Sequence, residues 1–221
     1  PDVTGPGVNI LADVARFNAT TGRGDPAGNN NIGFLSGTSM SSPHNAGAAA
    51  LLASLYPTWT PMEIKSALVT TGVTAGVLKD IGTAAAPQLV PTDPFDRGGG
   101  RVDVAAAARV GLVMNETAAN FTAANPATGG RPEQLNMPHF QNLNAQGTVT
   151  FNRSVKSVAT SPVTYTVSVT GLPAGIATTS VPSFTIAPGA SQALSLSVNV
   201  TTLSQSANTF GQLVLTPNNP N

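Results

Sequence analysis

The chain has 221 residues, a formal net charge of zero at pH 7 and only 9% charged residues, so it fits one large domain or two medium ones and gives nucleic-acid binding no electrostatic support. It contains no cysteine, which excludes disulfides and thiolate metal sites, and no apolar run of the roughly 20 residues that a membrane helix requires. The frequent Gly (22) and Pro (18) residues indicate many turns and short strands.

The first predicted element is a short buried strand, because Val8, Ile10 and Ala12 alternate after a turn rich in Gly and Pro. Residues 13–31 are polar and rich in Gly and Asn, which is typical of an exposed loop. Oxygen-bearing side chains in such a loop suit calcium, but they show no regular ligand spacing, so a solvated loop is favoured. The calcium candidates are Asp13, Asp25, Asn29, Asn30 and Asn31. A structural calcium ion is therefore the only cofactor considered, and none is assigned.

A short strand at 32–36 is expected to lead into a polar turn and then a helix of small apolar residues. Gly37 permits a tight turn, and Thr38 and Ser39 are good N-cap types, so the helix should begin near Ser39. Pro43 is expected in the first turn, where its missing N–H is not needed. A hydroxyl at a helix N-terminus lies beside unpaired N–H groups, where an oxyanion is stabilised. Taken without further context, a capped Ala-rich core helix accounts for the same pattern.

The eleven residues from Gly37 to Gly47 read Gly-Thr-Ser-Met-Ser-Ser-Pro-His-Asn-Ala-Gly. This string closely resembles the nucleophile segment of the subtilisin-like serine proteases, the subtilases, which reads Gly-Thr-Ser-Met-(Ala/Ser)-x-Pro-His-x-x-Gly. The resemblance implies that Ser39 is the nucleophile and that its own N–H belongs to the oxyanion hole. Asn45 stands where many members carry Val.

The start of the chain, Pro-Asp-Val-Thr-Gly-Pro-Gly-Val-Asn-Ile, resembles a second subtilase string that lies a little before the nucleophile. Gly5 replaces the Ala that is usual in that string. Two strings in the family's order strengthen the resemblance.

A second helix is predicted after Tyr56-Pro57 ends the first one. Thr60 and Glu63 have the spacing of a capping box, and Gly72 is expected to end the helix. Its apolar face comprises Ile64, Ala67 and Leu68. This pair of helices resembles the two that follow the serine in subtilases, where their role is packing.

Residues 73–97 are predicted to be irregular, and a helix is predicted between Asp103 as N-cap and Gly111 as C-cap. The string around Gly98–Asp103 resembles the one that closes the subtilase catalytic domain. A phosphate-binding loop is set aside there, because no clear strand precedes it and the Lys of a P-loop is missing.

From about residue 114 the sequence changes character. Residues 114–146 have few apolar repeats and are typical of a linker or wrapping segment. Residues 147–221 contain short stretches of alternating apolar and polar residues with turn signals between them, which favours a small antiparallel sandwich. This part resembles the fibronectin-III-like domain that follows the catalytic domain in some subtilases.

A serine hydroxyl needs a base to take its proton and a carboxylate to orient that base. The chain has two histidines, His44 and His139, and neither precedes Ser39. The resemblance implies that the catalytic Asp and His lie upstream of the serine and that His44 is structural. We therefore expect the chain to be the C-terminal part of a larger protease, inactive by itself and needing a companion segment that carries the Asp and the His.

The expected fold is α/β, as the C-terminal portion of a subtilisin-like doubly wound domain (residues 1–113), followed by the segment 114–146 and an antiparallel β-sandwich (147–221). The expected function is that of a secreted or cell-surface serine endopeptidase that acts on protein or peptide substrates through an acyl-enzyme on Ser39. The alternative is a non-catalytic protease-like scaffold or a module that binds a substrate or partner. Neither nucleic acid nor a membrane span is expected.

Overall fold

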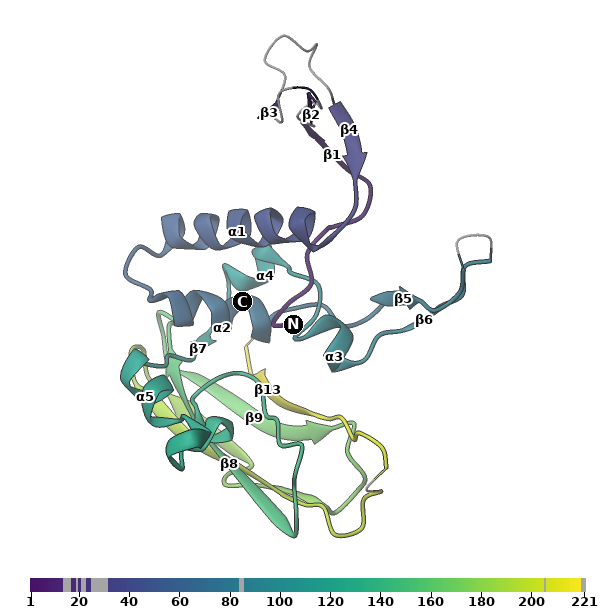
Figure 1. Cartoon of the computed structure of the whole chain (residues 1–221). Helices are drawn as coiled ribbons and strands as arrows, with labels where there is room; N and C mark the ends of the chain where they lie inside the picture. Colours follow the sequence, from purple (N-terminus) through teal and green to yellow (C-terminus); the bar gives the residue numbers. More distant parts are fainter. Residues whose placement is uncertain are drawn as a thin grey trace.

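The structure is a computed structural model that describes residues 1–13, 17–18, 20, 23–24, 32–83, 86–204 and 206–219. Two helices, α1 and α2, lie above a β domain, and two hairpins project from the helical part (Figure 1). Of the calcium candidates, Asp25 and Asn29–Asn31 lie outside the described residues.

The hairpin near the start of the chain pairs β1 (Ile10–Asp13) with β4 (Ile32–Leu35) in antiparallel register. Both strands were predicted, but the first begins at Ile10 and leaves Val8 73% exposed, and the alternating residues Ile10 and Ala12 are half-buried, not buried as expected. The exposed loop predicted over residues 13–31 lies largely outside the described residues. Within it, β2 (Phe17–Asn18) pairs with β3 (Arg23–Gly24).

Helix α1 (Thr38–Leu55) carries the serine string, and it ends at Tyr56 as predicted. The predicted cap was wrong, because Gly37 is the N-cap and no side chain caps the helix. Pro43 is the sixth residue of the helix and so lies beyond the first turn. Since proline has no N–H, the Ser39 carbonyl cannot receive the usual bond from position 43.

Helix α2 (Pro61–Thr70) has the predicted capping box, in which the Thr60 hydroxyl accepts from the Glu63 N–H and the Glu63 carboxylate accepts from the Thr60 N–H. Its C-cap is Thr71, one residue before the predicted Gly72. Helix α4 (Val104–Ala107) is capped by Asp103 as predicted, but Ala108 ends it before Gly111. The three helices enclose a small apolar core, whose buried members are Ala48, Leu52, Ala67, Leu68, Ala107 and Val113.

The prediction that residues 73–97 are irregular was also wrong. Strands β5 (Leu78–Asp80) and β6 (Leu89–Pro91) form the second projecting hairpin (Figure 1). Helix α3 (Pro94–Arg97) follows, with Asp93 and Asp96 forming its capping box.

The segment 114–146 contains α5 (Ala118–Ala123) and two short 3₁₀ helices, η1 (Pro126–Thr128) and η2 (Pro132–Gln134). It lies against the β domain, where the buried guanidinium of Arg153 donates to the carbonyls of Met137 (2.6 Å), His139 (2.7 Å) and Glu133 (3.1 Å). The same group lies 4.7 Å from the centre of the Phe140 ring. One cation thus ties the chain of this segment to the sheet.

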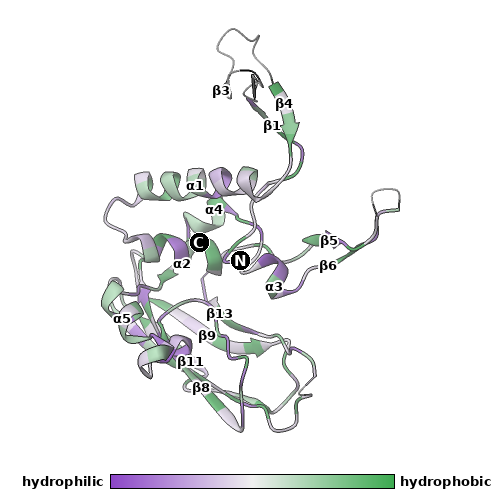
Figure 2. Cartoon of the chain, in the orientation of Figure 1, coloured by the Kyte–Doolittle hydropathy of each residue, from purple (hydrophilic) through white to green (hydrophobic). Residues whose placement is uncertain are grey.

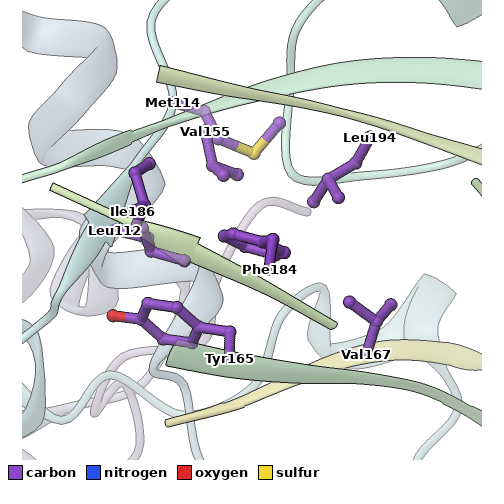
Figure 3. Packing of buried hydrophobic residues seen from close by; sticks show 8 residues of the cluster. All are labelled: Leu112, Met114, Val155, Tyr165, Val167, Phe184, Ile186 and Leu194. Carbon is purple, nitrogen blue, oxygen red and sulfur yellow. The ribbon is translucent and has the colours of Figure 1, made fainter. Parts of the chain in front are cut away.

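The β domain consists of two antiparallel sheets, with strand orders β10-β12-β8-β7 and β11-β9-β13. The strands are β7 (Leu112–Val113), β8 (Thr148–Ser157), β9 (Val163–Thr170), β10 (Ala177–Thr179), β11 (Ser183–Ile186), β12 (Ser191–Asn199) and β13 (Gln212–Pro217). Every second residue of β8 is buried, as the alternation predicts. Buried side chains from both sheets form one apolar core (Figure 3).

The helical part and the β domain are joined through β7, whose Leu112 and Val113 pair with Ser157 and Lys156 of β8. Val113 is fully buried and belongs to the helical core. Nearby, Lys156 Nζ lies 3.0 Å from the buried carboxylate of Glu63 in α2. The predicted boundary after residue 113 remains a prediction, but the strand before it belongs to a sheet of the β domain.

Candidate active site

The turn before α1 is held by the first residues of the chain. The Gly7 carbonyl accepts a hydrogen bond from the Gly37 N–H (2.7 Å), and the Ser36 hydroxyl accepts one from the Asn9 N–H (2.9 Å). One turn into the helix, the Ser41 hydroxyl donates to the Gly5 carbonyl (3.0 Å). The two stretches that share the subtilase resemblance therefore lie side by side and fix each other.

Ser39 is the second residue of α1, and its side chain is exposed. It lines a shallow pocket of about 320 Å³ between the helix start and β1. The other lining residues are Ile10, Ala12, Met40, Pro43 and His44. No described residue forms a hydrogen bond with the Ser39 hydroxyl, so it is free to approach a ligand in this pocket.

Two backbone donors beside Ser39 are also without partners. The N–H groups of Met40 and Ser41 donate to the Gly37 carbonyl, at 3.1 and 3.3 Å. By contrast, the N–H groups of Thr38 and Ser39 have no acceptor among the described residues. Free N–H groups at the positive end of an 18-residue helix favour negative charge, so this site suits an oxyanion that forms next to the Ser39 hydroxyl.

Neither histidine forms a hydrogen bond with the Ser39 hydroxyl in the described part of the chain, although His44 lines the same pocket. The His44 ring donates from Nδ1 to the Met40 carbonyl (2.8 Å), and five helix positions separate it from Ser39, about 140° around the helix axis. His139 lies elsewhere, with Nδ1 3.8 Å from Asp2 Oδ1, and lines a cleft of about 1800 Å³ between the helical part and the β domain. Burial lowers the pKa of His139, against the opposing effect of Asp2. The imidazole that would activate Ser39 is thus not provided by the described arrangement.

Within the described ranges, no group of three or more His, Asp or Glu side chains is placed to hold a metal ion. Asp13, the calcium candidate whose structure is described, ends β1. In the same ranges, none of the helices is sufficiently long and apolar to cross a membrane.

The sequence did not identify the backbone of residues 5–7 as part of this site. The Gly-Pro-Gly sequence was assigned to a turn, whereas the structure shows two of its carbonyls binding the start of α1. A signal was present, since Gly at both positions allows a close approach of two backbones. A Cβ on Gly7 would lie 2.9 Å from the Gly37 carbonyl oxygen.

Comparison with known proteins divides the chain into two parts. Residues 1–101 match the model of the subtilase family, and residues 134–221 match that of a fibronectin type-III domain. Among curated proteins, the chain is 34% identical over 202 residues to the subtilisin-like protease SBT1.7 of Arabidopsis thaliana, covering 80% of this chain and 26% of that protein. It is 31% identical over 244 residues to SBT2.5 of the same plant, covering 97% of this chain and 29% of the relative.

A third relative, the subtilisin-like protease SBT3.13 of Arabidopsis thaliana, is 43% identical over 115 residues, which is 52% of this chain and 14% of that protein. The chain therefore spans less than a third of the length of these relatives. The resemblance of both parts is confirmed: the chain belongs to the subtilase family and carries a segment of the subtilase domain followed by a fibronectin type-III domain.

Proposed function

We propose that the chain supplies the nucleophile of a subtilisin-like serine endopeptidase, with Ser39 as the attacking residue. The observation that carries the proposal is the exposed Ser39 hydroxyl beside two N–H donors without acceptors at the start of α1. The match of residues 1–101 to the subtilase family supports the same chemistry. Protein or peptide chains are the proposed substrates.

In the proposed reaction, Ser39 Oγ attacks the carbonyl carbon of a peptide bond while a histidine takes its proton. The negative carbonyl oxygen is stabilised by the N–H of Ser39 at the helix start. The C–N bond then breaks, the leaving amine receives the proton, and an ester of Ser39 remains. Water hydrolyses this ester and returns the free hydroxyl.

We further propose that the histidine and its orienting aspartate come from a companion segment of a doubly wound subtilase domain. Two features support this. Among the described residues, neither His44 nor His139 forms a hydrogen bond with the Ser39 hydroxyl, and α1 carries exposed apolar residues, with Leu51 59% and Leu55 60% exposed. Such apolar surface is typical of a face that another element covers. Without that segment, the chain is expected to have no peptidase activity.

The test uses a protein in which the chain is preceded by the subtilase segment that carries Asp and His. Ser39→Ala should abolish peptide hydrolysis and labelling by a fluorophosphonate probe, while the melting temperature changes little. Ser42→Ala is the matched control, since Ser42 is an exposed serine of the same helix, and it should retain activity. Hydrolysis that survives Ser39→Ala would refute the assignment.

The alternative is a protease-like scaffold or a module that binds a partner. The observation that favours it is that neither imidazole forms a hydrogen bond with Ser39 among the described residues. In that case, the longer protein with its upstream segment would neither hydrolyse peptides nor react with the probe. A secreted or cell-surface location is part of the proposal, and fractionation of the source cells with an antibody to the chain would test it.

A further inference from the structure

Two positions at which this chain departs from the first two subtilase strings would meet if the first carried a side chain. Gly5 stands where the first string usually has Ala, and Asn45 stands where the second often has Val. A Cβ placed on Gly5 would lie 2.6 Å from Asn45 Oδ1 and 3.0 Å from Asn45 Cγ. A Cβ is essentially never found closer than 3.0 Å to another heavy atom of this kind, so the Asn45 side chain occupies the space that a side chain at position 5 would need, and one of the two would have to shift.

The Asn45 side chain forms no hydrogen bond with the described residues that would hold it there. Its oxygen is buried and has no hydrogen-bond partner among the described residues. A buried amide oxygen without a donor is unfavourable, so this side chain does not contribute a hydrogen bond that would account for its presence. The backbone of Gly5 is not in the left-handed region that requires glycine. The missing Cβ is therefore explained by space and not by backbone conformation.

The contact lies close to the groups that fix the start of α1. The Gly5 carbonyl accepts from the Ser41 hydroxyl, and Ser41 precedes Asn45 by one helical turn on the same face. Two residues after Gly5, the Gly7 carbonyl accepts from the N–H of Gly37, the N-cap of α1. A shift of residues 5–7 away from the helix would therefore move the turn that presents Ser39.

We propose that Gly5 and Asn45 are a matched pair of positioning residues, which seat residues 5–7 against α1 and so set the position of Ser39. The proposal depends on the proposed role of Ser39 only for its catalytic consequence. The packing itself can be tested without any activity.

A double-mutant cycle tests the pair in the 221-residue chain. Gly5→Ala should lower the melting temperature by about 3–8 °C, because the new methyl group displaces either residues 5–7 or the Asn45 side chain. Adding Asn45→Ala should restore at least half of the lost melting temperature. The atom nearest to the new methyl group is then the Ser41 carbonyl oxygen, 3.1 Å away. If Gly5→Ala gives no folded protein, recovery of folded protein by the second substitution is the same result. Additive effects, or no recovery, would overturn the pairing.

Gly7→Ala is the matched control. A Cβ on Gly7 would meet Gly37 O at 2.9 Å and Ser41 Cβ at 3.0 Å, and Asn45 is not among its near neighbours. Asn45→Ala should therefore leave the defect of Gly7→Ala unchanged. Equal rescue of both glycine variants would mean that Asn45→Ala stabilises the chain generally, and it would refute a specific pair.

A second measurement reports on the position of the helix start. The Gly37 amide should exchange its hydrogen at least about tenfold faster in Gly5→Ala and regain protection in the double variant. In the longer protein with Asp and His, kcat should fall roughly tenfold or more with KM changed less than about twofold, and Asn45→Ala should restore it. If the unaltered longer protein hydrolyses no peptide, the proposed function fails. Hydrogen exchange at the Gly37 amide still tests the pairing of Gly5 and Asn45, because it does not depend on activity.

Discussion

The β domain and the subtilase segment differ in how completely they bury their apolar side chains. In the β domain, two sheets enclose their own core, and Val155 and Ile186 are 5% and 3% exposed. In the subtilase segment, hydrophobic residues continue onto the projecting β4 strand and along α1, where Phe34 is 70% exposed and Leu55 60% exposed (Figure 2). Alternating apolar residues on two facing sheets are therefore enough to form the core of a small β domain. A segment of an α/β domain, by contrast, has exposed apolar faces that other elements of such a domain would cover.

The sharpest test of this contrast is the loss of one large ring from each region. Phe184 is 8% exposed and stacks on Tyr165, with ring centres 5.5 Å apart. Phe184→Ala should lower the free energy of unfolding by about 3–5 kcal/mol, because it removes buried contacts and leaves a cavity. Urea unfolding followed by circular dichroism measures this change.

The matched substitution in the other region is Phe34→Ala. Because Phe34 is largely exposed, we expect a change within about 0.5 kcal/mol in the chain alone. A similar loss in both variants would mean that the hairpin is packed in solution, and the contrast between the two regions would not hold.

A second prediction concerns the cation that binds segment 114–146 to the β domain. Burial lowers the pKa of Arg153 to about 10, despite the favourable effect of Glu116, so the group remains charged at neutral pH. Arg153→Met should cost about 2–4 kcal/mol, since the carbonyls of Met137 and His139 lose their donor. Limited proteolysis should then cleave within residues 131–146 well before it cleaves the sheets. Unchanged cleavage would show that other contacts hold this segment.

A third prediction tests the junction between the regions. Lys156→Met removes the cation beside the Glu63 carboxylate, which is 3% exposed, and should cost about 1–2 kcal/mol. The estimate is moderate because the Lys156 side chain is itself 48% exposed and screened by water. Lys79→Met is a control, since its ion pair with Asp96 joins strand β5 of the projecting hairpin to helix α3 and does not involve the junction. Equal effects of both variants would remove the case for a special role of Lys156.

The pH dependence of stability follows from the same carboxylate. Burial alone would raise the pKa of Glu63, but hydrogen bonds from Thr60 and the charge of Lys156 outweigh it and lower this pKa. A lowered pKa means that the contribution to stability is present above the unfolded value of about 4.3 and is lost as pH falls through the native value. Melting temperatures between pH 7 and pH 3 should fall less steeply in Glu63→Gln. An identical slope would contradict this assignment.

The smallest expected loss of stability comes from removing the N-cap of α2. Thr60→Ala removes the acceptor of the Glu63 N–H and should cost about 1 kcal/mol by thermal unfolding. Thr117→Ala removes the equivalent contact of the short helix α5, where the N–H of Asn120 donates to Thr117. It should cost less, because α5 contributes no buried residue, and a reversed order would overturn this ranking.

Much of the fold was predictable where a local pattern had one solution. The capping box of Thr60 and Glu63, the Asp103 cap and the alternating strands of the β domain were all found in the structure. The N-cap of α1 was not predicted correctly. Gly37 has no side chain that would mark it as a cap, whereas the neighbouring Thr38 and Ser39 are of the types that usually cap helices. The hairpin β5–β6 was missed since its strands have only three residues each, too few to show alternation.

In the candidate site, the contacts were not predictable, and the role of Ser39 stays a prediction. Ser39 came from the motif, while the binding of Gly37 by the Gly7 carbonyl joins residues 30 positions apart and leaves no periodic trace. The burial of Glu63 was likewise not predictable from the sequence, because its partner Lys156 lies 93 residues further along the chain. Contacts between distant segments depend on how elements pack, which a single sequence does not specify.

Strand β7 has a consequence for how the molecule melts. Its two residues close a sheet of one region while Val113 packs in the core of the other, so neither region can lose its structure without removing support from its neighbour. Two sequence domains that share a strand in this way form a single cooperative unit. One calorimetric transition, not two, is then the natural behaviour of the chain.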